Sequence, residues 1–368
     1  MKNKSILSIS FLFASIVFVC CSKKNPTGGS ITNPPATSTP LKDASSIPVG
    51  VAVSYDLIKN NISYSALVKA HFDRITAEYQ MKHGAVVRND GSYDFSKVDD
   101  LFSIAQTAGL TVHGHTLAWH QNNNGNYLHS LGAAQVKDAF KNWIITMVTR
   151  YKGKVTGWDV ANEVVVDGTG DLRTAANSSG SGSDSFYWAD YLGRSYIDSA
   201  FVWANAADPS AKLFINDYNL EIDNRKLDSV IKMINALKAS SVPIHGVGLQ
   251  MHISINTSNA GIDNAFQKLA ATGLLIHVSE MDVRVNPSNT TPFTVTSALL
   301  DQQAAKFKYV AESYFRNVPP AQRYGLTVWN LTDADSWIVL SGKQDAPTLF
   351  DAGYNKKAAF TGYMQGLQ

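Results

Sequence analysis

Two hydrophobic patterns alternate along most of the chain. Short runs of apolar and β-branched residues, typical of buried parallel strands, lie at 49–54, 72–78, 111–115, 155–161, 212–216, 246–251, 275–279 and 324–329. Between them, apolar residues recur every three or four positions, as on one face of a helix, for example at 98–108, 136–151 and 227–237. Eight strands that alternate with helices predict a single α/β domain, a (β/α)8 barrel. An open, doubly wound sheet is the alternative, but no Gly-rich turn follows the first strand.

The N-terminus has a different pattern. Lys2 and Lys4 precede an apolar run at 6–19. This run is shorter than the roughly 20 residues that a membrane-spanning helix needs, and it is typical of a secretory signal. We therefore expect the protein to be exported.

Two cysteines follow the apolar run directly, and the composition then changes again. Cys20 and Cys21 resemble the lipidated cysteine of a bacterial lipoprotein signal, and the next residues are rich in Pro, Thr, Ser, Gly and Asn. We expect a signal peptide at 1–21, a linker at 22–44 and the barrel at 45–368. The protein would be lipid-anchored to the outer membrane or cell surface, or else secreted, and this anchor would be its only membrane contact.

Composition and charge exclude several classes of function. Hydrophobic residues make up 45% of the chain and charged residues 17%, which is enough to bury a large core. Lys and Arg number 32 and Asp and Glu number 30, so the net charge is +2 and no basic excess indicates a nucleic-acid partner. Both cysteines lie near the N-terminus, which excludes a disulfide framework or a cysteine nucleophile in the barrel.

Polar and aromatic residues collect where the predicted strands end, which is where (β/α)8 barrels carry their active sites. They are Glu78, Lys82, His115, Trp119, Asn162, Glu163, Asn216, Asp217, Gln250, His252, Glu280, Asp282, Trp329 and Trp337. Glu163 and Glu280 follow strands on nearly opposite sides of the barrel. Two such carboxylates suggest hydrolysis of a glycosidic bond, in which one acid protonates the leaving oxygen and the other carboxylate attacks or activates water.

Seven short motifs, in order, resemble glycoside hydrolase family 10, the endo-β-1,4-xylanases. They lie at 75–82, 114–120, 158–163, 216–219, 248–252, 279–283 and 328–337, and the resemblance runs from about Pro48 to Gln368. It implies an enzyme that cleaves internal β-1,4-xylosidic bonds in xylan with retention of configuration. It also implies a monomer that uses no cofactor and no metal.

The resemblance assigns roles to five of these residues. Glu163 would act first as general acid and then as general base, and Glu280 would be the nucleophile. His252 would hydrogen-bond the nucleophile, and Asp282 would orient that histidine. Asn162 would bind the 2-hydroxyl of the sugar under attack.

Further residues would bind the sugars themselves. Hydroxyl groups on the glycone side would be bound by Glu78, Lys82, His115 and Gln250, and the cleft would be walled by Trp119, Trp329 and Trp337. Three positions depart from the family pattern. Tyr79 stands where Asn is usual, at a position that touches the sugar next to the one attacked; Asn122 stands where a sugar-contacting Gln is usual; and Asn330 replaces a glycine.

Two other functions fit part of the pattern. His113 and His115 lie two apart on one strand, a spacing that some zinc-dependent barrel hydrolases use, with His252 and Asp333 as further candidate ligands. The barrel could also belong to a non-catalytic glycan-binding lipoprotein, although both glutamates are present. The tolerated xylan decorations, the product lengths and any activity on β-glucans depend on loops whose shape cannot be read from the sequence.

Overall fold

A closed barrel of parallel strands forms the centre of the protein. The computed structural model describes residues 39–180 and 182–368. Within these residues the barrel strands are β1 (Val49–Val53), β2 (Arg74–Ala77), β3 (Thr111–Ala118), β4 (Val155–Asn162), β5 (Lys212–Asp217), β6 (Gly246–Leu249), β8 (Leu275–Arg284) and β9 (Arg323–Val328). Each strand pairs in parallel with the next, and β1 pairs with both β2 and β9, which closes the barrel. The short β7 (His252–Ser254) follows β6 and pairs with the outer end of β8. The prediction of a (β/α)8 barrel is confirmed.

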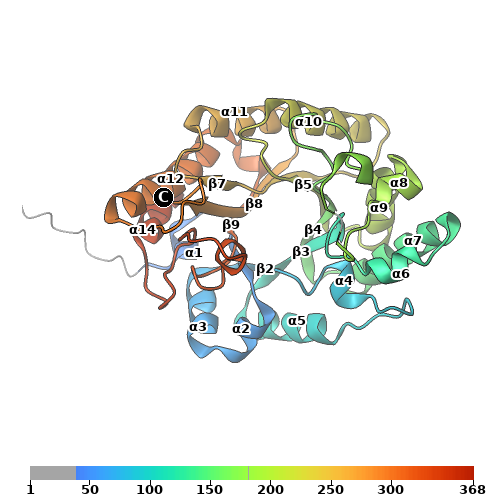
Figure 1. Cartoon of the computed structure of the whole chain (residues 1–368), viewed down its shortest axis with the longest axis horizontal. Coiled ribbons are helices and arrows are strands. Elements are labelled where there is room, and N and C mark those ends of the chain that lie inside the picture. The colour runs from blue at the N-terminus through green and yellow to red at the C-terminus, as the bar shows by residue number, and fades with distance from the viewer. Residues whose placement is uncertain (1–38, 181) are drawn as a thin grey trace, which may run out of the picture. The chain divides into compact units, whose positions relative to one another are not determined.

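Helices surround this barrel (Figure 1). The longer ones are α3 (Ile62–His71), α5 (Ser96–Ala108), α7 (Ala133–Arg150), α9 (Ser195–Ala207), α10 (Asn224–Ala239), α11 (Asn259–Ala270), α12 (Ser297–Asn317) and α14 (Ala358–Leu367). The three predicted helical segments correspond to α5, α7 and α10. Their apolar faces are buried against the strands, which is why the three-to-four spacing is visible in the sequence.

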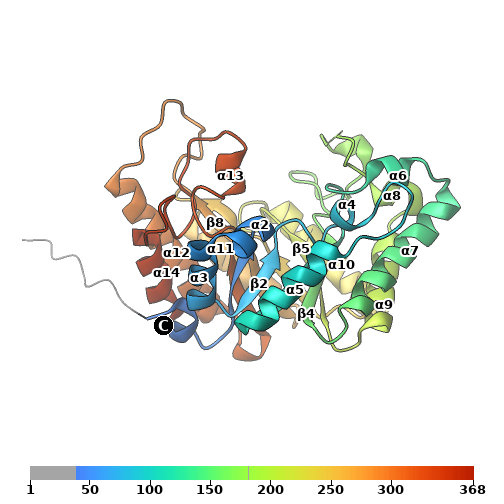
Figure 2. The same cartoon turned by 90° about the horizontal axis from the view of Figure 1, so that it is seen from below.

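Short helices occupy the loops that leave the carboxyl ends of the strands. They are α2 (Tyr55–Asn60), α4 (His83–Val86), α6 (Gly125–His129), α8 (Trp188–Leu192) and α13 (Trp337–Leu340). Short 3-10 turns lie at Ala175–Asn177 and Pro320–Gln322. Figure 2 shows α4, α6, α8 and α13 at the same end of the barrel. This end is therefore built from loops and short helices, whereas the barrel wall is built from strands.

A close backbone approach helps to position β4, which carries one of the two candidate glutamates. The ring of Trp158 lies directly against Gly114 on β3, and a Cβ atom at that position would come within 2.2 Å of the ring. Only glycine leaves room for the indole here. This contact explains the small residue at the start of the second sequence motif.

The folded domain begins earlier than expected. Helix α1 (Leu41–Ala44) lies inside the range predicted to be linker, yet Leu41 is fully buried in the hydrophobic core. Burial of Leu41 ties this segment to the domain, so the boundary predicted at residue 45 is too late. The predicted signal peptide, Cys20, Cys21 and the rest of the predicted linker lie outside the described residues. No helix within residues 39–180 and 182–368 has the length and apolar character needed to cross a bilayer.

Candidate active site

Glu280 lies on β8 and is held through both of its carboxylate oxygens. The Asn216 side chain donates a hydrogen bond of 2.7 Å to Oε1, and His252 Nε2 lies 3.3 Å from Oε2. His115 Nδ1 lies 4.0 Å from Oε1. Burial alone would raise the pKa of Glu280, but the imidazoles of His115 and His252 outweigh it and hold the pKa below its ordinary value. Glu280 is therefore ionised and fixed in place.

His252 stands between two carboxylates. Its Nδ1 lies 2.8 Å from Asp282 Oδ2, and its Nε2 faces Glu280. A carboxylate only accepts hydrogen bonds, so both ring nitrogens must carry a proton to satisfy both neighbours. Burial by itself would lower the pKa of His252, but Asp282 and Glu280 outweigh it and raise the pKa to about 10. The ring is thus an imidazolium that neutralises charge beside Glu280.

Glu163 follows the last residue of β4 and has a different setting. Its backbone adopts the left-handed region with φ 55°, an uncommon conformation for a residue with a side chain. The Arg173 Nε donates a hydrogen bond of 2.6 Å to the Glu163 carbonyl oxygen. The Glu163 backbone amide donates one of 2.8 Å to the Asn216 carbonyl oxygen. The side-chain amides of Gln250 and Asn162 both donate hydrogen bonds to Glu163 Oε1, at 3.1 Å and 3.4 Å respectively. The backbone is held by ordinary hydrogen bonds, and the carboxylate has neutral amide partners.

A chain of side-chain amides connects the two glutamates. The Asn216 Nδ2 donates hydrogen bonds to Glu280 Oε1 and, at 2.8 Å, to Asn162 Oδ1. Because Asn162 Oδ1 faces Asn216, the Asn162 Nδ2 faces Glu163. The Ser279 hydroxyl donates a hydrogen bond of 2.6 Å to Asn216 Oδ1, which fixes the orientation of the Asn216 side chain. The sequence places Asn216 at a strand end but assigns it no role. Its position at the end of the fifth strand, between the strands of the two glutamates, is the signal that could have identified it.

The two histidines of the metal hypothesis share a carboxylate instead. His113 Nε2 lies 3.1 Å from Asp159 Oδ1, and His115 Nδ1 lies 2.9 Å from Asp159 Oδ2. Burial would raise the pKa of Asp159, but the two imidazoles lower it well below its usual range. The further candidate ligands lie in other networks, since His252 bonds to Asp282 and Asp333 pairs with Lys357 at 3.0 Å. Among the described residues, no group of three or more potential ligand side chains is arranged to hold a metal ion.

Lys82 and Glu78 extend the site from β2. Lys82 is buried and Glu78 is half-buried. The Lys82 ammonium lies 4.5 Å from the ring centroid of Trp119 and 5.9 Å from that of Trp329. Burial lowers the pKa of Lys82, although Glu280, Glu78 and Glu163 act in the opposite direction. Burial raises the pKa of Glu78, and Lys82 opposes this rise. This part of the site offers one cation, one carboxyl group and two aromatic rings.

The comparison with known proteins agrees with this geometry. The model of the family described as glycosyl hydrolase family 10 matches residues 39–365. The chain belongs to glycosyl hydrolase family 10. Endo-1,4-beta-xylanase A from Cellvibrio japonicus is 35% identical over 90% of this chain and 57% of its own length. A beta-1,4-xylanase from Dictyoglomus thermophilum is 33% identical, with 85% of this chain and 86% of the relative covered.

Solved structures of family 10 proteins also superpose on this one. The structure of xylanase 10C from Cellvibrio japonicus, a mutant in complex with xylopentaose, has a TM-score of 0.81 at 34% identity and covers 89% of this chain and 69% of the other. A family 10 structure from Paenibacillus barcinonensis has a TM-score of 0.82 at 31% identity, covering 89% and 97%. The chain spans 57% and 56% of the length of two of the curated relatives, both from Cellvibrio japonicus.

Two tryptophans close this family 10 site on the side of β9. Trp329 is almost fully buried, 5.4 Å from the His115 ring and 6.2 Å from that of His252. Trp337, the first residue of α13, is 41% exposed. Its indole Nε1 donates a hydrogen bond of 2.8 Å to Asp282 Oδ2. Asp282 therefore positions both the histidine beside Glu280 and the exposed ring of Trp337.

The departure at Asn330 has a structural explanation. Its backbone has φ 66°, which favours glycine, but asparagine tolerates this conformation better than most other residues. The Asn330 Oδ1 also accepts a hydrogen bond of 2.9 Å from the Trp337 backbone amide. The side chain that replaces a glycine thus helps to fix the start of α13.

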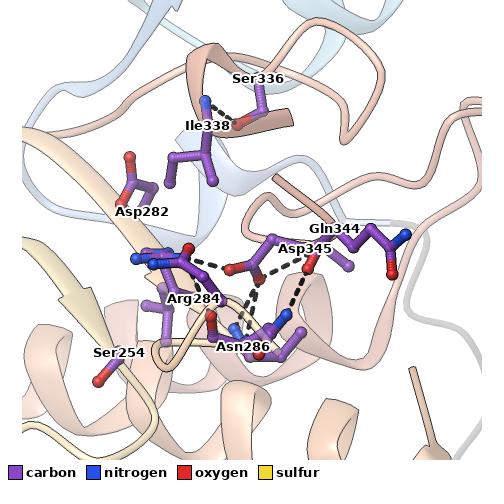
Figure 3. Close-up of polar contacts among 12 residues, drawn as sticks. Ser254, Asp282, Arg284, Asn286, Ser336, Ile338, Gln344 and Asp345 are labelled. Atoms are coloured by element: carbon purple, nitrogen blue, oxygen red, sulfur yellow. Dashed lines mark hydrogen bonds and ion pairs between the residues drawn. The ribbon is translucent and has the colours of Figure 1, made fainter. Parts of the chain in front are cut away.

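An ion pair at the outer end of β8 joins two loops, the one that follows β8 and the one that follows α13 (Figure 3). Arg284, two residues beyond Asp282, donates a hydrogen bond of 3.0 Å to Asp345, whose side chain is fully buried. Asp345 also accepts from the Val285 amide at 2.8 Å, and the Asn286 side chain donates 2.9 Å to the Gln344 carbonyl. These contacts tie the loop that follows β8 to the loop that follows α13. No local pattern in the sequence marks this pair, because its members lie 61 positions apart.

All twelve predicted site residues lie at the carboxyl ends of the strands or in the loops that follow. Seven of them form two groups of polar contacts, which Asn216 joins by bonding to both Asn162 and Glu280. One group is Glu163, Asn162 and Gln250, and the other is Glu280, His252, Asp282 and His115. Glu78, Lys82, Trp119, Trp329 and Trp337 lie around these groups. Sequence reasoning missed the roles of Asp159, Asn216 and Arg173. Arg173 comes from a loop ten positions beyond Glu163, and no local pattern marks it.

Proposed function

We propose that the protein is a retaining endo-1,4-β-xylanase, with Glu280 as nucleophile and Glu163 as general acid and base. The observation that carries this proposal is the contrast between the two carboxylates. Glu280 is held ionised by two imidazoles, whereas Glu163 has neutral amide partners and is joined to Glu280 through Asn216 and Asn162. Retaining glycosidases need one carboxylate that stays charged and one that exchanges a proton.

The first step would form a covalent glycosyl-enzyme. A Glu280 carboxylate oxygen attacks the anomeric carbon of the xylose ring, and the bond from that carbon to the leaving oxygen breaks. Glu163 gives its proton to the leaving oxygen, so that the aglycone departs as an alcohol. The Asn162 side chain binds the 2-hydroxyl of the same ring, a contact that strengthens in the transition state. A hydrogen bond of 2.8 Å from Asn216 holds Asn162 in place for this contact.

The second step would release the sugar. Glu163, now ionised, removes a proton from a water molecule, whose oxygen attacks the anomeric carbon as the ester bond to Glu280 breaks. The two displacements restore the original anomeric configuration. His252 stabilises the carboxylate of Glu280 as it leaves, because its imidazolium remains charged at neutral pH.

Two observations support xylan as the substrate. The chain is similar to a beta-1,4-xylanase along 86% of that relative's length, and a structural relative binds xylopentaose. The cleft also combines aromatic rings, which suit the apolar faces of pentose rings, with Lys82, Glu78 and Gln250, which suit their hydroxyls.

Product analysis provides the test. Linear xylan, glucuronoxylan and a soluble β-glucan are digested, and the products are followed by chromatography, while proton NMR records the anomer formed first. We expect xylo-oligosaccharides of several lengths and an initial β-anomer. Release of xylose alone from chain ends would contradict endo action, and an initial α-anomer would contradict retention.

For the whole chain, we propose a monomer that is exported and held by an N-terminal lipid. The hydrogen bonds that hold Glu163 and Glu280 need no residue from a second copy, which supports the monomer. The charged start, the apolar run at 6–19 and the pair Cys20–Cys21 support the lipid anchor. Mass spectrometry of the N-terminus and fractionation of cells that express Cys20→Ser and Cys21→Ser variants test the anchor. An unmodified N-terminus on a membrane-free enzyme would favour simple secretion.

A further inference from the structure

His113 is a buried imidazole inside the barrel that the proposed mechanism does not use. It precedes His115 by two positions on β3, so the two side chains point to the same face of the strand. His113 is 1% exposed, and each of its ring nitrogens has a polar neighbour. Nε2 lies 3.1 Å from Asp159 Oδ1, and Nδ1 lies 3.1 Å from the Tyr324 hydroxyl oxygen. The protonation of His113 therefore follows from what these two groups donate and accept.

The neighbours of Tyr324 determine the proton on Nδ1. Thr156 donates its single hydroxyl proton to the Val112 carbonyl oxygen at 3.1 Å. The Tyr324 hydroxyl lies 2.9 Å from Thr156 Oγ1 and therefore donates its own proton there. The Tyr324 oxygen then accepts from His113, so Nδ1 carries a proton. A Cβ atom at Gly157 would come within 2.6 Å of the Tyr324 hydroxyl, so glycine leaves room for this arrangement.

Asp159 determines the proton on the other nitrogen. Its ionised carboxylate only accepts hydrogen bonds, so Nε2 of His113 also carries a proton. With both nitrogens protonated, His113 is an imidazolium that pairs with a carboxylate, and each residue of this pair is only 1% exposed.

Two other basic side chains lie close to this pair. The ring centroid of His277 lies 4.7 Å from that of His113. Burial lowers the pKa of His277 well below its ordinary value, and His113 and Arg74 add to this effect, so His277 is neutral. The Arg74 guanidinium lies 4.2 Å from the ring centroid of Tyr324, and its Nη1 donates a hydrogen bond of 3.4 Å to the Tyr324 carbonyl oxygen. His113 is therefore the cation that contacts Asp159 at Oδ1.

Asp159 connects His113 to the site. Its Oδ2 lies 2.9 Å from His115 Nδ1, and the same nitrogen lies 4.0 Å from Glu280 Oε1. Asp159 thus orients an imidazole beside Glu280, but its negative charge also acts on Glu280. Burial raises the pKa of Glu280 and the Asp159 charge adds to this rise, whereas His115 and His252 lower the pKa. A cation on the other oxygen of Asp159 offsets the unfavourable part of this interaction.

We propose that His113 is a positioning residue that acts on Glu280 through Asp159. Its imidazolium neutralises Asp159, so that Asp159 holds His115 without leaving an uncompensated negative charge near the nucleophile. This inference deepens the proposed function and rests on it. Loss of the His113 charge should therefore make Glu280 easier to protonate and reduce activity first in acid solution.

Nitrogen-15 NMR of enzyme labelled in its nine histidines tests the charge at neutral pH. We expect the signals that are lost in His113→Gln to show protons on both ring nitrogens. Tyr324→Phe keeps the ring but removes the acceptor at Nδ1, so His113 should lose that proton while it still donates to Asp159. A neutral His113 in the wild type would overturn the proposal.

The pH dependence of kcat/KM on 4-nitrophenyl β-xylobioside tests the effect on Glu280. The titratable or charged groups around Glu280 are Lys82, His115, Asp159, Glu163, His252 and Asp282, and the variants at 113 and 324 retain all of them. His113→Gln retains an amide donor for Asp159 but no charge. Because the acid limb reports the ionisation of Glu280, it should move to higher pH by about half a unit, which lowers kcat/KM on that limb about threefold. Tyr324→Phe should move the limb in the same direction.

A matched variant distinguishes charge from packing. His277→Gln removes an adjacent, equally buried imidazole that is neutral, and it should leave the acid limb in place. Thermal unfolding verifies that each variant is folded. An equal shift in His277→Gln, or a loss of activity in His113→Gln and Tyr324→Phe without a shift, would assign the effect to packing and overturn the proposal. A wild type that cleaves neither the xylobioside nor xylan would overturn the proposed function, and the role of His113 with it, even where NMR detects the imidazolium.

Discussion

Glu163, directly after β4, and Glu280, on β8, belong to one site but have contrasting surroundings. Glu280 has a partner at each oxygen, one of which is an imidazolium, and its pKa lies below the ordinary value. Glu163 has neutral amide partners, and it is its backbone, rather than its carboxylate, that is firmly held. The difference matches two tasks: a nucleophile must stay charged and aimed, whereas an acid and base must change its protonation in every cycle.

The comparison also explains why imidazole side chains contact only one of the two glutamates. A fixed positive charge stabilises the ionised form of a carboxylate, whereas a neutral amide affects the two forms more evenly. The cationic partner of Glu280 is itself maintained by Asp282 on the same strand. Charge compensation on β8 is thus built from alternate residues of one strand, which point to the same face.

The largest expected effect is the loss of the nucleophile. Glu280→Ala should reduce kcat/KM on both xylan and an aryl xylobioside by at least about 10⁴-fold, because no other carboxylate occupies its position. Steady-state kinetics measures the loss, and circular dichroism shows whether the variant is folded. Near-normal turnover would mean that the assignment of the two glutamates is wrong.

The second effect should divide the two chemical steps. Glu163→Ala should lose about 10²–10⁴-fold on xylan, where the leaving oxygen needs a proton. With an activated aryl xylobioside the first step needs little acid, so the glycosyl-enzyme should form rapidly and then hydrolyse slowly. Stopped-flow measurement should show a burst of phenolate, and mass spectrometry of the quenched protein should detect the adduct. Equal loss on both substrates with no burst would contradict the acid/base role.

The third effect concerns the charge of His252. Its pKa of about 10 means that it is protonated at neutral pH and loses its proton only in strongly alkaline solution. Asp282→Asn removes the charge that opposes burial, so the pKa of His252 falls. The alkaline limb of the pH profile of kcat/KM should then move to lower pH by at least about one unit, since each unit corresponds to about 1.4 kcal/mol of lost interaction.

A matched control is available for this variant. Trp337→Phe removes the indole hydrogen bond to Asp282 but keeps its charge. It should weaken the cleft wall without moving the alkaline limb. If both variants move the limb equally, geometry rather than charge sets the pH dependence.

The fold was largely predictable because a buried parallel strand leaves an unbroken apolar run. The eight runs lie at the eight barrel strands, although β3 and β8 extend several residues beyond the predicted ends, by residues 116–118 and 280–284. The extension of β8 carries Glu280 and Asp282, whose polar side chains interrupt the apolar pattern. The start of the domain was misplaced because α1 is a single turn, too short to show a period.

The site was predictable where its residues sit at strand ends and not elsewhere. Glu163 and Glu280 lie in short motifs on β4 and β8, whose position in a barrel is known once the strands are counted. Arg173 and the pair Arg284–Asp345 act through contacts between distant segments. Such contacts depend on how loops fold over the barrel, and no spacing within the sequence encodes them.

The smallest expected effect tests how the backbone of Glu163 is held. Arg173 donates hydrogen bonds of 2.6 Å to the Glu163 carbonyl oxygen and 3.1 Å to the Val165 carbonyl oxygen. These two bonds stabilise the backbone on which Glu163 has its left-handed conformation. Arg173→Ala should lower kcat on xylan about fivefold, or ~1 kcal/mol, by loosening the carboxylate, with little change in KM. Arg225→Ala, which removes a comparable contact of 2.8 Å to the Gly168 carbonyl, should change kcat by less than about twofold. Because His252 also holds Glu280, and Arg173 does not contact it, the burst with an activated aryl xylobioside should remain fast in Arg173→Ala. If the burst slows as much as turnover on xylan, the two strand ends are mechanically coupled, and the separation between a locked nucleophile and a braced acid/base fails.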